Sequence, residues 1–191
     1  MTARLILASG SPRRSYLLAD AGLRFEVLRP TVAESASRAL TVCELTAGNA
    51  ARKAREIARV HPDAVVVGAD TLVSVDQEII GKPADLCAAF ETLRRLSGRE
   101  HQVCTGVFIC SIALRRQISF CAVSDVRFKK LTDDEIRAHM TRINPLDKAG
   151  GYAAQEHGSE IIERIRGSFT NVVGLPMSET LAALCEFGVG D

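Results

Sequence analysis

One candidate phosphate-binding segment follows a short apolar stretch near the N-terminus. Ser9-Gly10-Ser11-Pro12-Arg13-Arg14 comes directly after Leu5 to Ala8 and opens a stretch with apolar residues at helical spacing. Backbone N–H groups at a helix N-terminus, serine hydroxyls and forked guanidinium groups all bind phosphate oxygens. The alternative is a well-capped helix start with solvated arginines. The candidate phosphate ligands are Ser9, Ser11, Arg13 and Arg14.

An acidic residue after a buried strand marks a second candidate site. Gly68-Ala69-Asp70-Thr71 follows the apolar run Ala64 to Val67, and Gly81-Lys82-Pro83 comes about one hairpin later. A carboxylate here can hold Mg2+ or Mn2+, or take a proton from an attacking water, while Lys82 offsets polyphosphate charge. An Asp that caps a turn and pairs with Lys82 is the alternative. We expect Asp70 at a strand end or bulge.

Three further residues have side chains that suit a nucleotide site. Lys148 and Gln155 lie in the glycine-containing run from Asp147 to Gln155. The lysine can meet phosphate, and the glutamine amide has the donor and the acceptor that recognition of a pyrimidine edge requires. Lys53 stands beside the apolar stripe of an expected helix and can reach over its edge. For each of the three, an ordinary loop or solvated surface residue is the alternative.

Glu34 completes the set of candidate carboxylates. It follows the second expected strand, where a loop can carry a second metal-facing carboxylate, and a surface acid is the alternative.

Helix-period and strand-period segments alternate from end to end, which indicates an α/β or mixed α+β architecture. We expect strands at Arg4 to Ala8, Phe25 to Leu28, Ala64 to Val67, Leu72 to Val75, Glu78 to Ile80, His101 to Leu114, Ile118 to Phe128 and Glu160 to Ile165. We expect helices at Pro12 to Ala21, Val42 to Val60, Ala84 to Leu96, Asp133 to Met140 and Pro176 to Phe187. These elements leave most of the candidate residues in loops beside strand ends.

Composition narrows the class of protein. With 191 residues, 47% of them hydrophobic, the chain can form one large domain or two lobes around a cleft. A net charge of +1, two tyrosines and no tryptophan argue against a nucleic-acid partner. No apolar stretch approaches the roughly 20 residues that span a bilayer or resembles a signal peptide, so we expect a cytoplasmic protein without a membrane partner. The six cysteines form no C-x-x-C pair, and we expect them all to be reduced.

Several common enzyme motifs are absent from the sequence. There is no G-x-x-x-x-G-K-[ST] P-loop, no G-x-G-x-x-G fingerprint, no G-x-S-x-G elbow and no H-E-x-x-H zinc motif.

Taken in order, the motifs resemble the signature of the Maf family of nucleotide pyrophosphatases from about Leu5 to Leu184. The matching pieces are Leu7-Ala8-Ser9-Gly10-Ser11-Pro12-Arg13-Arg14, Glu34, Lys53, Gly68-Ala69-Asp70-Thr71, Gly81-Lys82-Pro83, Thr105-Gly106-Val107, Asp147-Lys148-Ala149-Gly150-Gly151-Tyr152 and Asn171-Val172-Val173-Gly174-Leu175-Pro176. The sequence departs from the usual pattern at Glu156, where glycine is common, and at Phe169, where tyrosine is frequent.

The resemblance implies a single domain over residues 1–191, with an α/β fold similar to inosine triphosphate pyrophosphatases. That fold has an elongated mixed sheet flanked by helices, two lobes around a nucleotide cleft and often a homodimer. The family's general base falls on Asp70. Its polar cleft falls on Ser9, Arg13, Arg14, Glu34, Lys53, Lys82 and Lys148, and the positions that set a preference for dTTP and UTP fall on Arg13, Thr71 and Gln155.

These implications lead to a hypothesis of metal-assisted hydrolysis of a nucleoside triphosphate to its monophosphate and diphosphate. Mg2+ or Mn2+ would bridge the phosphate and the carboxylates of Glu34 and Asp70, and the cations would stabilise the leaving group. Two alternatives remain open. One is a pyrophosphatase for modified or other nucleotides such as 7-methyl-GTP, and the other is a non-catalytic regulator of septum formation or cell division.

Overall fold

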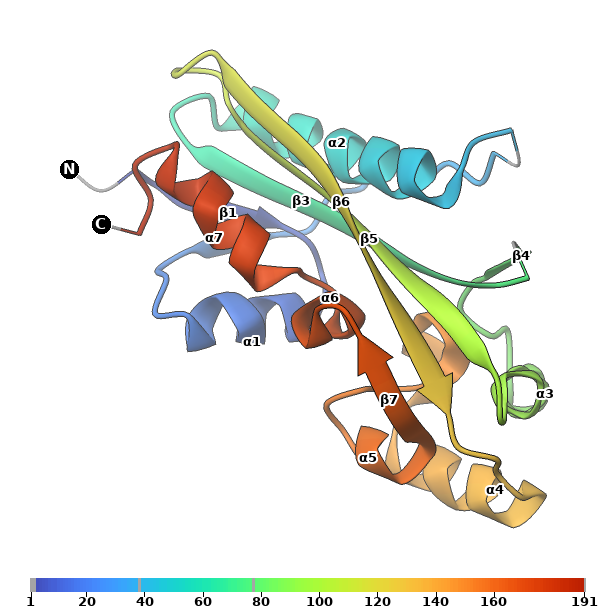
Figure 1. Ribbon diagram of the computed structural model, residues 1–191. Coiled ribbons are helices and arrows are strands. Elements are labelled where there is room, and N and C mark those ends of the chain that lie inside the picture. Colours follow the sequence, from blue (N-terminus) through green and yellow to red (C-terminus); the bar gives the residue numbers. More distant parts are fainter. Residues whose placement is uncertain (1–2, 38, 77, 191) are drawn as a thin grey trace. The chain divides into compact units, whose positions relative to one another are not determined.

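A computed structural model describes residues 3–37, 39–76 and 78–190 (Figure 1). The chain divides into two compact units. The first unit comprises Met1–Asp70, Thr105–Ala122 and Gly174–Asp191, and the second comprises Thr71–Cys104 and Val123–Val173. Each unit is therefore built from segments that are distant in sequence. In the described part of the chain, no helix is both long enough and apolar enough to cross a membrane.

The strands form one seven-stranded mixed sheet with helices packed against it, as expected for an α/β fold. The strand order is β2-β1-β3-β5-β6-β7, and β4 pairs with β3. Strand β1 is parallel to both β2 and β3, whereas β4 and β7 run antiparallel to their neighbours. The strands are β1 (Leu5–Ala8), β2 (Glu26–Leu28), β3 (Val65–Val75), β4 (Glu78–Ile80), β5 (Glu100–Ser111), β6 (Arg116–Phe128) and β7 (Ile162–Arg166).

In the described residues, α-helices lie between the strands and after β7, and two short 3-10 turns lie between α4 and α5. The helices are α1 (Pro12–Asp20), α2 (Val42–Val60), α3 (Leu86–Leu96), α4 (Asp133–Arg142), α5 (Gly158–Ile161), α6 (Phe169–Val173) and α7 (Met177–Cys185), and the turns are η1 (Pro145–Asp147) and η2 (Ala149–Gly151). The expected helices and strands are present with small shifts at their ends, except that the two strands expected at Ala64 to Val67 and Leu72 to Val75 are one strand, β3. The short helices α5 and α6 were not expected, because four or five residues give no detectable helical period.

Helix α2 covers one face of the first unit's strands. A capping box at Thr41 and Glu44 fixes its start, since each side chain accepts a hydrogen bond from the other residue's backbone N–H. Its small residues Ala50, Ala54 and Ala58 pack on a core that includes Ile6 and Val66. Alternation along β1 and β3 turns the neighbouring residues, such as Leu5 and Val65, to the opposite face.

Strand β3 corrects one expectation about Asp70. Two strands were expected here with Asp70 at a strand end or bulge, but β3 runs unbroken through 11 residues. Gly68 and Asp70 lie in its middle, two residues apart, so both point to the face covered by α2. Asp70 is consequently a buried strand residue, only 6% exposed.

The second unit has its own apolar core. Val73, Leu93 and Val126 pack there with a cluster of aromatic rings from His101, Phe128 and Tyr152, which are separate in sequence. Side-chain caps start α3 and α4: the Asp85 carboxylate accepts from the Ala88 N–H, and Thr132 forms a capping box with Glu135. These caps match the helix starts expected at these positions within two residues.

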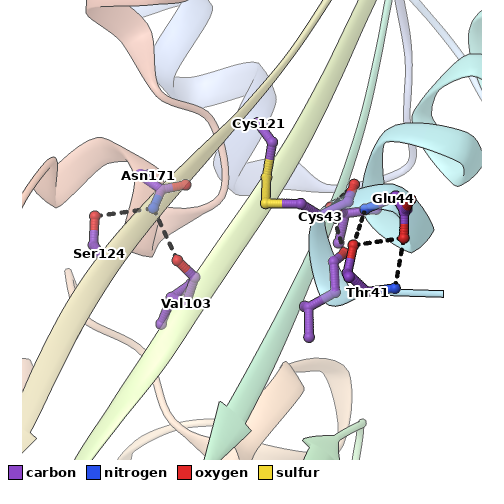
Figure 2. Close-up of a disulfide and its surroundings, with 9 residues drawn as sticks. Thr41, Cys43, Glu44, Val103, Cys121, Ser124 and Asn171 are labelled. Atoms are coloured by element: carbon purple, nitrogen blue, oxygen red, sulfur yellow. Dashed lines mark hydrogen bonds between the residues drawn. A yellow bond between two sulfur atoms is a disulfide. The ribbon is translucent and has the colours of Figure 1, made fainter. Parts of the chain in front are cut away.

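Two of the cysteines are paired, so the expectation that all six are reduced is wrong for these two. Cys43, in the first turn of α2, forms a disulfide with Cys121 of β6, with the Cα atoms 5.8 Å apart (Figure 2). The two residues are separated by 78 positions, and only the packing of α2 on the sheet brings them together. Cys87, Cys104, Cys110 and Cys185 carry thiols.

Candidate active site

One face of α2 organises a polar site in the first unit. Asn49, Lys53 and Glu56 follow one another at helical spacing, and each side chain bonds to the loop 31–35 or to the residues of β3. The Glu56 carboxylate accepts from the backbone N–H groups of Thr31 and Val32 and from the Thr31 hydroxyl. These bonds lower the pKa of Glu56, with the Thr31 hydroxyl the largest cause. The loop is thus attached to the helix along two turns.

Lys53 joins the two candidate carboxylates. Its Nζ lies 2.8 Å from Asp70 Oδ1 and 2.6 Å from Glu34 Oε1. The side chains of Lys53 and Asp70 are only 10% and 8% exposed, whereas that of Glu34 is 59% exposed. Buried charges are stable only when they are paired in this way, so the ammonium group and the Asp70 carboxylate depend on each other. The sequence analysis placed all three residues in one site, and the structure brings them together.

Asn49 belongs to the same cluster and was missed. Its Nδ2 donates to Asp70 Oδ2 over 3.0 Å and to the Ser35 carbonyl over 3.2 Å, while its Oδ1 accepts from the Ser35 N–H over 2.7 Å. The side chain is 3% exposed. The available signal was a polar residue one helical turn before Lys53, next to the alanine stripe that marks the buried face of α2.

Two glycines allow α2 to approach the sheet closely enough for these contacts. A Cβ atom on Gly68 would lie 2.3 Å from the Ala50 carbonyl oxygen, and one on Gly106 would lie 2.3 Å from the Ala47 nitrogen. Both distances are far below van der Waals contact with backbone atoms that cannot rotate away. Because neither position carries a side chain, the backbone of α2 lies close enough to the strands for its side chains to contact Asp70.

Arg14 and Ser9 form a second polar group at the start of α1. The Arg14 Nη1 donates to the Ser9 hydroxyl over 3.1 Å, and its Nε donates to the Gly174 carbonyl over 2.9 Å. The Ser9 hydroxyl also accepts from the Ser11 N–H, and Ser11 occupies the N-cap position without a side-chain cap bond to a described group. The helix start expected at Pro12 is correct, and the Ser9 side chain binds the Ser11 N–H there.

Burial and neighbouring charge act on Arg14 in opposite directions. Burial lowers its pKa to about 10, and the charge of Arg13 adds to this, while the carboxylates of Asp70 and Glu34 raise it. Arg14 therefore stays cationic at neutral pH. The charges of Arg13, Glu34 and Asp70 therefore all act on the Arg14 guanidinium group. The start of α1 has no acidic residue in its first turn to compete for a bound anion.

The remaining candidates belong to the second unit. Thr71 directly follows Asp70 at the boundary between the units, and Gln155 is exposed. The exposed Lys82 and the buried Lys148 lie on two segments that meet, because the Gly150 N–H donates to the Gly81 carbonyl. Lys148 Nζ lies 2.8 Å from Asp147 Oδ1 and also donates to the Asn144 carbonyl.

The carboxylates of the first unit suit a divalent cation. Glu34 and Asp70 each direct an oxygen at one cationic centre, the Lys53 ammonium group. Carboxylate oxygens are the ligands that Mg2+ and Mn2+ prefer, so the donor set fits the metal expected from the sequence. Among the described residues, the group with three potential metal ligands consists of Cys43, Cys104 and Cys121, and two of these are joined in a disulfide.

The fold and this site define an α/β protein with a carboxylate and ammonium cluster on a central strand and a buried arginine at a helix start. A family model described as "Maf-like protein" matches residues 4–187, and the chain therefore belongs to the Maf family. It is 42% identical over 189 residues to a dTTP/UTP pyrophosphatase of Bacillus velezensis, covering 99% of both chains. It is 44% identical over 187 residues to a dTTP/UTP pyrophosphatase of Symbiobacterium thermophilum, covering 97% of this chain and 94% of the relative.

The solved structure of the Ham1 protein of Staphylococcus aureus has a similar fold. The TM-score is 0.53 at 13% sequence identity, with 96% of this chain and 98% of that chain covered.

Proposed function

We propose that this protein hydrolyses dTTP and UTP to the nucleoside monophosphate and diphosphate. The observation that carries the proposal is the Asp70–Lys53–Glu34 cluster, in which the Lys53 ammonium group of α2 lies beside the buried Asp70 carboxylate of β3 and beside Glu34. The relatives named dTTP/UTP pyrophosphatases, similar over nearly the whole chain, support the same activity.

In this proposal, Asp70 orients a water molecule and accepts its proton as the water oxygen attacks the α-phosphorus. A new P–O bond forms there, the bond from the α-phosphorus to the bridging oxygen breaks, and its electron pair leaves with the diphosphate. Arg13, Arg14 and Lys53 supply positive charge for the diphosphate, helped by the hydroxyls of Ser9 and Ser11. Lys82 and Lys148 of the second unit are proposed as further phosphate contacts.

The proposed cofactor is Mg2+ or Mn2+, held by Glu34 and Asp70. When bound, such a cation neutralises phosphate charge and makes the phosphorus more electrophilic. We also propose that Arg13, Thr71 and Gln155 contribute to the choice of base, because the amide of Gln155 can pair with the donor and acceptor of a pyrimidine edge.

The test is diphosphate release by wild type and by Asp70→Asn from dTTP, UTP, CTP, the purine triphosphates and 7-methyl-GTP, with Mg2+ or Mn2+. Asparagine keeps the shape of the side chain and removes the base, so we expect turnover to fall by about 100-fold or more. Circular dichroism and thermal unfolding show whether the variant remains folded.

Two results would contradict the proposal. Near-normal turnover by Asp70→Asn excludes Asp70 as the base. Absence of turnover by folded wild type with every nucleotide and metal excludes the hydrolase and favours a binding role in the control of cell division.

A further inference from the structure

We infer that Asn49 is a positioning residue that holds the Asp70 carboxylate and the loop carrying Glu34 in one fixed arrangement. This inference rests on the proposed function, because it assigns to Asn49 the orientation of the proposed base. Asn49 matches no motif that the sequence analysis singled out.

The three hydrogen bonds of Asn49 use its whole amide group. One N–H goes to Asp70 Oδ2, the other to the Ser35 carbonyl, and the amide oxygen accepts the Ser35 N–H. Ser35 directly follows Glu34 in the chain. A single buried side chain therefore connects the backbone beside one proposed metal ligand to the carboxylate of the other.

The pattern of donors and acceptors requires an asparagine. Rotating the amide by 180° would place its oxygen against both the Asp70 carboxylate and the Ser35 carbonyl, and its NH2 against the Ser35 N–H. An aspartate would keep the acceptor for Ser35 but put a second negative charge against Asp70. An alanine would leave Asp70 Oδ2 and the backbone of Ser35 without these partners, at the cost of a buried polar group.

Asn49 and Lys53 each bind one oxygen of the Asp70 carboxylate. The Lys53 ammonium group donates to Oδ1 and the Asn49 amide donates to Oδ2. Both side chains come from α2, and together they fix the plane of the carboxylate. Lys53 also places a positive charge beside the Asp70 carboxylate, whereas the neutral Asn49 amide only fixes the orientation of that carboxylate. Removing Asn49 should therefore disturb the geometry of the site while leaving its charge unchanged.

Steady-state kinetics with dTTP tests this role through the separate values of kcat and KM. We expect Asn49→Ala to lower kcat by about 10- to 100-fold with KM changed less than about threefold, because a misaligned base affects the chemical step. The matched control is Gly48→Ala, the adjacent position on α2, where an added Cβ would meet nothing within 4 Å. Its kcat should equal that of wild type.

Asn49→Asp keeps the inference testable if the alanine variant does not fold. It is nearly isosteric, retains an acceptor for the Ser35 N–H and loses the donor to Asp70, and its kcat should fall at least as far as that of Asn49→Ala. A folded Asn49 variant with kcat within twofold of wild type, or with a change in KM alone, would overturn the inference.

Amide hydrogen exchange, without metal or nucleotide, provides a second readout. Loss of the Asn49 acceptor should speed exchange at the Ser35 N–H by about tenfold or more in Asn49→Ala, while amides in the middle of α2 keep wild-type rates. Faster exchange throughout α2 would indicate a merely structural role and would contradict local positioning.

Asp70→Asn separates failure of this inference from failure of the proposed function. If Asp70→Asn retains turnover, the proposed base is wrong whatever Asn49 does. If it loses turnover while Asn49→Ala retains it, only the positioning role is wrong. If both are right, adding Asn49→Ala to Asp70→Asn should cause little further loss, because the aligned group is already absent.

Discussion

Burial sets the protonation state of His101 in the second unit. Its ring packs edge-on against Phe128 and Tyr152, with centroids 4.8 and 5.4 Å apart, and its Nε2 lies 2.9 Å from the Tyr152 hydroxyl. Burial lowers the pKa of His101 to about 4 and raises the pKa of Tyr152. Both groups are therefore neutral at physiological pH, as members of an aromatic core should be.

The pKa of His101 predicts a loss of stability in acid. The unfolded chain takes up a proton near pH 6.5 and the folded chain only near pH 4, so protonation favours unfolding as the pH falls between these values. Above pH 6.5 the contribution is constant. From pH 7.5 to 4.5 the free energy of unfolding should drop by about 2–3 kcal/mol from this residue alone.

Urea denaturation of wild type and His101→Phe at both pH values measures this loss. Between pH 7.5 and 4.5, the free energy of unfolding of the variant should drop by about 2–3 kcal/mol less than that of wild type. The absolute stability of the variant will also change, because the Tyr152 hydroxyl loses its hydrogen-bond partner. Equal pH dependence in the two proteins would exclude His101 as the cause.

At the scale of elements, the close packing of α2 on the sheet determines the site. Asn49 and Lys53 reach Asp70 because Gly68 and Gly106 let the helix backbone approach the strands. A side chain at either glycine must push the helix away, and this would lengthen every contact from α2 to the carboxylate.

We therefore expect Gly68→Ala to destabilise the protein by about 1–3 kcal/mol through overpacking and to lower turnover. Gly48→Ala, in α2 but away from the sheet, should be neutral or stabilise by up to about 1 kcal/mol, since alanine favours helix. Thermal unfolding of the two variants provides the comparison. A Gly68→Ala protein as stable and active as Gly48→Ala would show that the close approach is unimportant.

At the scale of the whole molecule, the Cys43–Cys121 disulfide closes a loop of 78 residues in sequence. A cross-link over this separation restricts the unfolded chain and typically stabilises by about 2–4 kcal/mol. Oxidised wild type should therefore unfold at higher urea concentration than reduced wild type. Cys43→Ser should show no such redox dependence, and Cys185→Ser, which removes an exposed thiol, should behave as wild type. Equal midpoints for oxidised and reduced wild type would contradict the prediction.

Local patterns in the sequence predicted much of this protein. The apolar periodicity identified α2 with the bounds the structure has, and the expected start of α4 at Asp133 is also correct, because these signals depend on neighbours a few residues away. The ordered motifs identified the family and named Asp70, Lys53, Glu34 and Arg14 as site residues.

Only the tertiary structure showed how those residues meet. The unbroken course of β3 through Asp70 follows from its pairing with other strands. The role of Asn49 and the pairing of Cys43 with Cys121 depend on where α2 packs against the sheet. That position follows from the two glycines and from contacts between residues far apart in the chain. A motif records which side chains are present, whereas the distance between two of them is set by the packing of the backbones that carry them.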